Sequence, residues 1–306
     1  MKTMSLKIIL VYVMLCFIWG STWLTIRLGL ESLTPIFSAG IRFTMASIFI
    51  IILMRIRGVR LQLDKLSIKL YLIMGFLSFV IPFGLVYWAE QFVPSGMAAV
   101  LFAVFPFFVA IFSYFSISSD SIDKFKIIGI ILGFLGIVII FSDSFGGDIT
   151  DYLLGMIAIV LSGIMQAAIA VTIKKYGHHL NPLSMNFVPM LIAGIAMIII
   201  GFSIENTSAN VYGIDAILSI LYLALFGSVV TFTSYYWLIK RINLVILSLI
   251  AFITPIVALF LGFILYDEQL STRHFIGSMF VLLGVLAANM GNLLKMKKGT
   301  FMKKDT

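Results

Sequence analysis

The chemistry that this sequence can perform depends on a few polar side chains inside long apolar runs. Arg42 lies about seven residues into the run from 35 to 54, roughly 10 Å from its end at a rise of 1.5 Å per residue. A guanidinium in hydrocarbon costs about 2.5 to 3.5 kcal/mol, so such residues face a bundle interior and find a partner. Arg42 is therefore a candidate site for an anionic group such as a substrate carboxylate. A structural pair or a packing contact is the alternative.

Glu90 stands near the end of the run from 70 to 92, at a depth close to that of Arg42. The two side chains could pair with each other. A carboxylate at this depth could also carry a proton for exchange, and a solvated helix end is the third interpretation. We take Glu90 as the candidate for proton coupling.

Aromatic, hydroxyl and amide groups at helical spacing predict the lining of a cavity. Trp19 falls near the middle of the first run, away from the interfacial positions that tryptophan prefers, and Trp23 follows at i+4. Core packing is the alternative for both. Polar groups inside later runs could bind a ligand or form hydrogen bonds between helices; they are Gln166, Ser228, Thr231 and Tyr235.

Two prolines, Pro106 and Pro255, lie in the middle of other runs. Each would free a backbone carbonyl and bend its helix, so the pair are hinge candidates, with a fixed bend as the alternative. Trp88 and Trp237 sit close to helix ends and are predicted interfacial residues.

Signals for catalysis or metal binding are missing from the sequence. It has no HExxH, P-loop or GxSxG motif, and its histidines, His178, His179 and His274, fall in loops. The single cysteine, Cys16, excludes an intrachain disulfide and a cysteine metal cluster. We expect no enzyme activity, no metal site and no cofactor.

The runs that carry these residues are those of an integral membrane protein. The 306 residues are 61% hydrophobic and 11% charged, and a span needs about 20 apolar residues. The sequence therefore predicts an all-α chain of ten transmembrane helices, at about 8–28, 35–54, 70–92, 95–116, 125–142, 151–173, 182–202, 214–238, 244–266 and 275–293.

The net charge of +8 indicates membrane topology rather than nucleic-acid binding, because the Lys and Arg residues gather in the segments on one side of the predicted spans. With the amino terminus inside, 18 of the 21 Lys and Arg residues fall in inner segments. The positive-inside rule then predicts a cell-membrane protein with both termini in the cytoplasm.

An internal repeat divides the chain into two halves. Tyr87-Trp88 recurs as Tyr236-Trp237, and Pro106 recurs as Pro255, both at a separation of 149 residues. Because each half has five spans, an odd number, the second half enters the membrane in the opposite orientation. We predict two inverted five-helix repeats, at 1–146 and 147–306.

Several short segments form a recognisable pattern. They are Ile18-Trp19-Gly20-Ser21-Thr22, Ile41-Arg42-Phe43 with Ala46, Gln91-Phe92-Val93-Pro94-Ser95-Gly96 with Ala98-Ala99-Val100-Leu101 and Pro106, and in the second half Thr254-Pro255 with Asp267-Glu268. Over nearly its whole length the chain resembles the EamA-like family of the drug/metabolite transporter superfamily. One position departs: Glu268 aligns with Ser119, beside Asp120, so the first half lacks the glutamate often found there.

The resemblance implies ten helices, cytoplasmic termini, a central cavity formed by both halves, and secondary transport of small metabolites, often outward. The leading hypothesis is a permease of the bilayer that exports amino acids or related amphipathic metabolites by alternating access, with possible homodimerisation. An importer stays open within that class. The other classes are an intramembrane enzyme, which lacks clustered catalytic groups, and a non-transporting scaffold, which leaves the intramembrane polar groups unexplained.

Overall fold

The computed structural model describes residues 6–116, 124–142, 151–239, 241, 247 and 250–301, and helices make up nearly all of this part of the chain. The first half contains α1 (Leu6–Leu30), α2 (Pro35–Ile56), α3 (Lys65–Met74), α4 (Ile81–Ala89), α5 (Ser95–Phe102), α6 (Phe105–Ser116) and α7 (Lys124–Ser142). The second contains α8 (Asp151–Tyr176), α9 (Pro182–Ile204), α10 (Ile214–Ala224), α11 (Thr231–Ile239), α13 (Ile250–Tyr266) and α14 (Thr272–Phe301).

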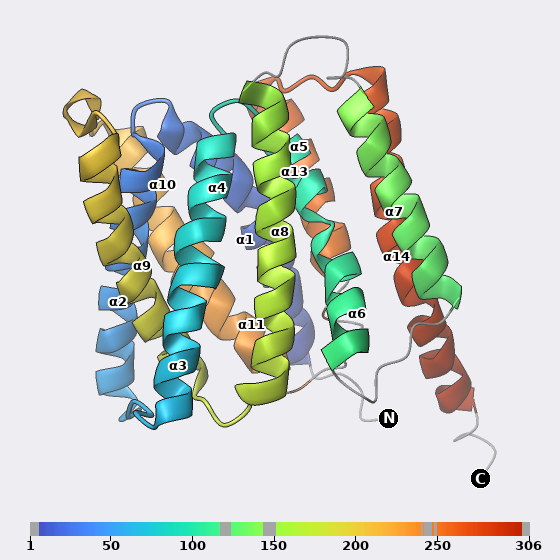
Figure 1. Cartoon of the computed structure of the whole chain (residues 1–306), viewed down its shortest axis with the longest axis horizontal. Coiled ribbons are helices and arrows are strands. Elements are labelled where there is room, and N and C mark those ends of the chain that lie inside the picture. The colour runs from blue at the N-terminus through green and yellow to red at the C-terminus, as the bar shows by residue number, and fades with distance from the viewer. Residues whose placement is uncertain are drawn as a thin grey trace.

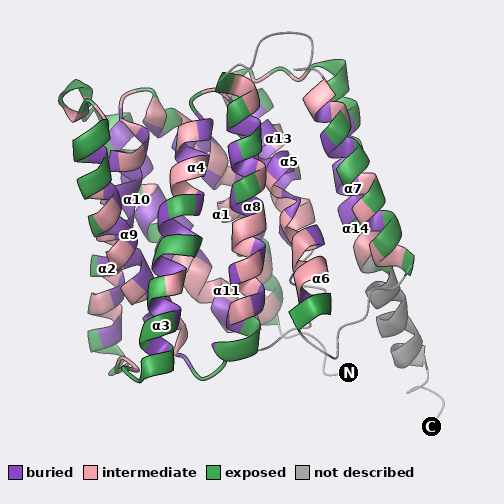
Figure 2. Ribbon diagram, in the orientation of Figure 1, coloured by how far each residue is buried: buried purple, intermediate pink, exposed green. Residues whose placement is uncertain are grey.

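The helices form a multi-pass membrane bundle. Within the described residues, eight helical stretches are long and apolar enough to span a membrane, and Ile250–Tyr266 and Thr272–Ala288 are shorter apolar helices. Large apolar side chains such as Phe115 and Phe263, 79% and 66% exposed, lie on the outside of the bundle, as a hydrocarbon solvent allows (Figure 2). The predicted ten-helix fold is confirmed, and α1 begins and α14 ends at the same end of the bundle (Figure 1).

The two halves share an uncommon backbone element. The third span of each half changes from α-helix to a six-residue π-helix in its middle, η1 (Gly75–Val80) before α4 and η3 (Leu225–Val230) before α11. The π-helices lie 150 residues apart, within one residue of the offset that the sequence repeat gives. Such segments are rare and widen the backbone, leaving carbonyl groups free for other partners. The repeat therefore places one irregular backbone segment in each half.

Glycines hold two of the outer helices together. On α7, a Cβ added to Gly136 would lie 2.5 Å from the carbonyl oxygen of Gly277 on α14. In the same interface, a Cβ on Gly284 would lie 2.6 Å from the backbone nitrogen of Gly133. Only glycine permits backbones to approach so closely, as in other membrane helix pairs. These residues are packing contacts between the fifth spans of the two halves.

The two prolines of the repeat occupy different local structures. The fourth span breaks after Phe102, and Pro106 is the second residue of the helix that resumes at Phe105, a position that needs no backbone N–H. Pro255, in contrast, lies inside the continuous helix α13. Their role as hinges stays a prediction.

Candidate functional site

Arg42 lies at the junction of the two halves and is 2% exposed. Its Nε donates to the Ser228 hydroxyl at 3.0 Å, its Nη1 to the Tyr87 hydroxyl at 3.1 Å, and its Nη2 to the carbonyl oxygen of Gly227 at 3.2 Å. Its Cζ also lies over the rings of Phe43 and Phe83, 5.1 and 5.2 Å from their centroids. All these hydrogen-bond and ring partners are neutral, and the Glu90 carboxylate is a charged group that interacts with Arg42 electrostatically.

The π-helix η3 creates the acceptor that Arg42 uses. Ser228 donates its own hydroxyl to the carbonyl of Leu223, five residues earlier, at 2.9 Å, which orients the oxygen toward Arg42. A side chain at Gly227 is excluded, because a Cβ there would lie 2.9 Å from the Thr22 methyl and 3.4 Å from the Arg42 Nη2. The glycine and the wide backbone turn together let the guanidinium reach the main chain.

Gln166 makes the corresponding contact in the other half. The Gln166 amide donates to the carbonyl oxygen of Ser78 in η1 at 2.8 Å, and the Ser78 hydroxyl donates back to the Gln166 amide oxygen at 2.7 Å. Gln166 belongs to α8 in the second half, and η1 belongs to the first. Each π-helix is therefore bound by a polar side chain from the opposite half: η1 by Gln166 and η3 by Arg42.

The predicted aromatic residues fall into two groups. Trp19 packs on Tyr235 and Phe232, with ring centroids 5.3 and 5.6 Å apart, next to the π-helix η3. Trp23 packs instead on Phe102, at 5.5 Å, where the fourth span breaks. Of the predicted lining residues, the structure thus joins Arg42 to Ser228 and Trp19 to Tyr235, and it places Trp23 and Gln166 in separate contacts.

Buried polar atoms without hydrogen-bond partners also occur on α9 and α11. Thr231 is fully buried, and its hydroxyl has no hydrogen-bond partner among the described residues. The amide oxygen of Asn186, on α9, is likewise buried without a hydrogen-bond partner in the described part of the chain, whereas the hydroxyl of Ser184 interacts with Tyr71. Unsatisfied polar groups at membrane depth are costly, so Thr231 and Asn186 are candidates for contact with a ligand.

Glu90 lies just after α4 and is fully buried, yet neither carboxylate oxygen has a hydrogen-bond partner among the described residues. The guanidinium of Arg27 donates to the backbone carbonyl of Glu90, not to its side chain. Arg42 directs its hydrogen bonds elsewhere, so no hydrogen bond joins it to Glu90 in this conformation. The buried carboxylate therefore has no hydrogen-bond donor in the described part of the chain, although the charges of Arg27 and Arg42 lie close enough to attract it.

Two glutamates cap helices at the end of the bundle opposite the termini. Both oxygens of Glu268 accept backbone N–H groups at the start of α5, from Ser95 at 2.7 Å and Gly96 at 3.0 Å. Glu205 caps α2 in the same way, accepting from Ile36 at 2.7 Å and Phe37 at 2.9 Å. The positions aligned with Glu268 in the first half, Ser119 and Asp120, lie outside the described residues.

Glu268→Ala should lower the stability of the protein by about 1 kcal/mol, because two N–H groups of α5 lose their acceptor and the helix dipole loses a negative charge. The measurement is the thermal unfolding midpoint in detergent. Asp267→Asn is the matched control: it removes the adjacent charge but tolerates the positive φ of 50° at that position. Equal midpoints for Glu268→Ala and Asp267→Asn would show that the cap contributes nothing.

The histidines take part in polar contacts near helix ends. His179 Nε2 lies 3.1 Å from the Ser67 hydroxyl, and His274 Nε2 lies 3.2 Å from the hydroxyl of Tyr152. Hydrogen bonds from the Ser67 hydroxyl and backbone N–H lower the pKa of Asp64, which caps α3. In the described ranges no three His, Cys, Asp or Glu side chains gather as metal ligands would.

Some residues of the site carry no strong sequence signal. The repeat is the sole sequence signal for Tyr87, and Ser78 has none, although both bind predicted site residues. Arg27 follows Trp19 and Trp23 at helical spacing, and that periodicity could have indicated it. Asn186 could have been found as a lone amide inside an apolar span.

Comparisons of the sequence and of the fold with known proteins agree with each other. The profile of the EamA-like transporter family matches this chain twice, at residues 6–142 and 153–290. The uncharacterized inner membrane transporter YedA of Escherichia coli K12 is 32% identical over 282 residues, which cover 90% of this chain and 89% of YedA. Protein PagO of Salmonella typhimurium is 27% identical, covering 93% of each chain. A solved crystal structure with 16% identity superposes with a TM-score of 0.70, covering 93% of this chain and 98% of that one.

Proposed function

The chain belongs to the EamA-like transporter family, and on that premise we propose that it is a secondary-active permease that exports amino acids or related amphipathic metabolites by alternating access. Its place is the cell membrane, with both termini in the cytoplasm, in agreement with the charge distribution and with the similarity to YedA, an inner membrane transporter.

The observation that carries this proposal is the environment of Arg42. An arginine has five N–H groups, and three of them bind neutral partners of the protein, which leaves two without a partner among the described residues. No carboxylate of the described chain forms a hydrogen bond with it. A buried cation held ready in this way supports the binding of a ligand that brings a negative charge, such as the carboxylate of an amino acid.

The cavity would form around Arg42 along the faces that carry the predicted lining residues. Trp19 and Tyr235 offer an aromatic surface for the apolar part of a metabolite, and Thr231 offers a free hydroxyl. Ser228 would hold Arg42 in place. Gln166 and Trp23, which lie in separate contacts, would join the lining when the halves move.

Alternating access would use the contacts between the halves. The hydrogen bonds of Arg42 to η3 and of Gln166 to η1 each cross from one half to the other, so a rocking motion must break or shift them. Pro106 and Pro255 are the proposed hinges, because Pro106 follows the break between α5 and α6 and Pro255 removes a hydrogen bond inside α13. Glu90 is the proposed proton carrier, since its carboxylate is buried and unpartnered.

A ligand screen on the purified protein tests the carboxylate site. Amino acids and other small carboxylates should raise the unfolding midpoint, while the matching amides should not, because only the carboxylate binds Arg42. A ligand at 100 times its Kd stabilises by about 2.7 kcal/mol, which a thermal shift resolves. The same shift should vanish in Arg42→Met. Equal stabilisation by carboxylates and amides, or by carboxylates in Arg42→Met, would overturn the assignment.

A further inference from the structure

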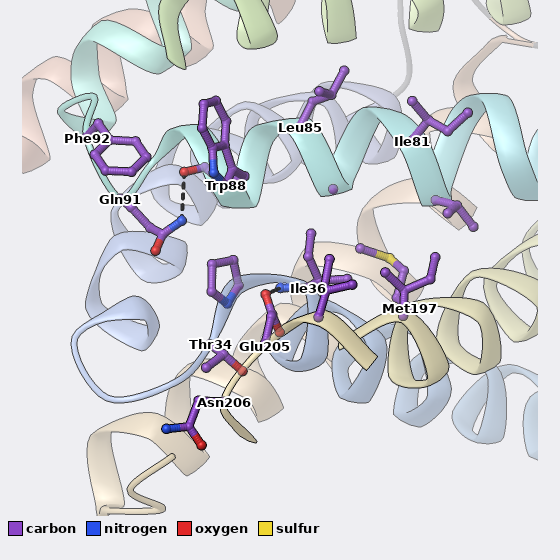
Figure 3. Close-up of a pocket in the computed structure, with 15 residues that line it drawn as sticks. Thr34, Ile36, Ile81, Leu85, Trp88, Gln91, Phe92, Met197, Glu205 and Asn206 are labelled. Atoms are coloured by element: carbon purple, nitrogen blue, oxygen red, sulfur yellow. Dashed lines mark hydrogen bonds between the residues drawn. The ribbon is translucent and has the colours of Figure 1, made fainter. Parts of the chain in front are cut away.

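A pocket of about 720 Å³ opens on the side of the bundle, away from Arg42. One wall is formed by the end of η1 and by α4, which contribute Val80, Ile81, Gly84, Leu85 and Trp88, and the other by the start of α2 and the last turns of α9. Figure 3 shows Ile36 and Met197 across the gap from α4, while the side chains of Ile81, Leu85 and Trp88 project from the other side of that helix. The volume lies within the range of small-molecule sites, about 300 to 1,000 Å³.

The pocket is continuous with the membrane-facing wall of the protein. Ile81, Ile200 and Ile204 line it and are 42%, 37% and 71% exposed. In a bilayer such side chains contact lipid, and the part of the pocket around Val80, Ile81 and Leu85 has no polar side chains that would retain water. The part of the surrounding bilayer that can enter the pocket is therefore the hydrocarbon chain of a lipid.

Polarity changes along the depth of the pocket. From Trp88 to Ile81 on α4 is seven residues, or about 10 Å, and the deep part is apolar. The polar residues lie at the end away from the termini, where Gln91 and Asn206 are exposed. This order, polar at the membrane boundary and apolar toward the midplane, is the order of a membrane lipid.

The mouth offers neutral donors rather than charges. The hydroxyl of Thr34 is buried and has no hydrogen-bond partner among the described residues. Both carboxylate oxygens of Glu205 are already engaged by the N–H groups of α2. Ester carbonyls, which lie between the headgroup and the chains of a glycerophospholipid, are acceptors of the kind that the Thr34 hydroxyl could bind.

We propose that this pocket binds one acyl chain of a glycerophospholipid from the leaflet opposite the termini, with an ester carbonyl at Thr34. The site is distinct from the transport site but shares a wall with it. The other face of α4 carries Phe83 and Tyr87, which contact the guanidinium of Arg42. A bound chain thus supports the helix that positions Arg42.

Gly84 provides the test variant, because its position lines the pocket floor. A Cβ there would lie 3.5 Å from the Ile36 Cδ1 and 4.0 Å from the Met197 Cε, so alanine fits at ordinary contact and leucine fills the space. Native mass spectrometry of the purified protein with added phosphatidylethanolamine should show one more retained lipid for wild type and Gly84→Ala than for Gly84→Leu. Equal lipid counts in the three proteins would overturn the proposal.

Two further measurements keep the proposal testable if Gly84→Leu does not fold. Thr34→Val keeps the volume and removes the hydroxyl, and it should weaken phospholipid retention about fivefold, the value of one hydrogen bond. Phosphatidylethanolamine with brominated chains should quench Trp88 in a protein whose other tryptophans are phenylalanine. Retention of palmitate as strong as that of phospholipid, retention unchanged by Thr34→Val, or occupation by detergent alone would reject a glycerophospholipid site.

Discussion

Arg42→Met is expected to reduce substrate counterflow in proteoliposomes by about 10- to 100-fold, the equivalent of one hydrogen bond to a charged group. The same change should alter the stability of the protein little. Hydrogen bonds between membrane helices average about 0.6 kcal/mol, so the three lost bonds cost about 2 kcal/mol. Removing a central arginine relieves an insertion cost of about 2.5 to 3.5 kcal/mol, which is of the same size.

This separation of activity from stability distinguishes a ligand-binding Arg42 from a structural one. Gln166→Met is the matched control, because it removes the bridge to η1 in the other half without removing a charge. It should slow counterflow, but carboxylates should still stabilise this variant more than the matching amides do. A large fall in the unfolding midpoint of Arg42→Met, with counterflow per folded molecule preserved, would return Arg42 to a packing role.

Glu90→Gln is expected to abolish uphill transport driven by a proton gradient while leaving counterflow intact. Glutamine occupies the same buried space but cannot release or take up a proton. If one proton moves per substrate, a gradient of one pH unit supports about a tenfold concentration ratio, and the variant should show none. Accumulation in proteoliposomes with an imposed pH gradient measures this ratio.

Glu205→Gln serves as the control for Glu90→Gln. Glu205 lies at the same end of the bundle, but both of its carboxylate oxygens are bound to the first N–H groups of α2. Its carboxylate acts as a helix cap, so the variant should keep the proton-driven ratio. Proton-driven accumulation that survives Glu90→Gln would remove Glu90 from the coupling role.

The spans and their repeat could be predicted because each depends on a feature that lies along the chain. A hydrocarbon solvent demands about 20 consecutive apolar residues per helix, so spans such as Pro35–Ile56 are visible as runs. The recurrence of Tyr87-Trp88 and Pro106 at one offset revealed two copies. Arg42 and Glu90 stood out for the same reason, since a charge in an apolar run is conspicuous.

The partners of those residues could not be predicted, because they depend on backbone geometry that leaves no periodic signature. Apolar periodicity does not distinguish a π-helical turn from an α-helical one, and η3 supplies the carbonyl that Arg42 binds. Glu268 looked like the acidic end of a span, yet it caps α5, 172 positions away in the chain. Similar depth suggested that Arg42 and Glu90 could pair; their charges do interact, but no hydrogen bond joins them in this conformation, because depth does not fix the direction in which side chains point.

The sequence by itself determined that this chain is a ten-helix, two-copy membrane protein and which few polar residues lie inside it, because membrane insertion is read from local composition. The tertiary structure alone decided what those residues touch. It joined Arg42 to one π-helix and Gln166 to the other, left the Glu90 carboxylate without a hydrogen-bond partner in the described ranges, and opened a lateral pocket beside α4. Each of these depends on how separate helices meet, which is set by packing across the whole bundle.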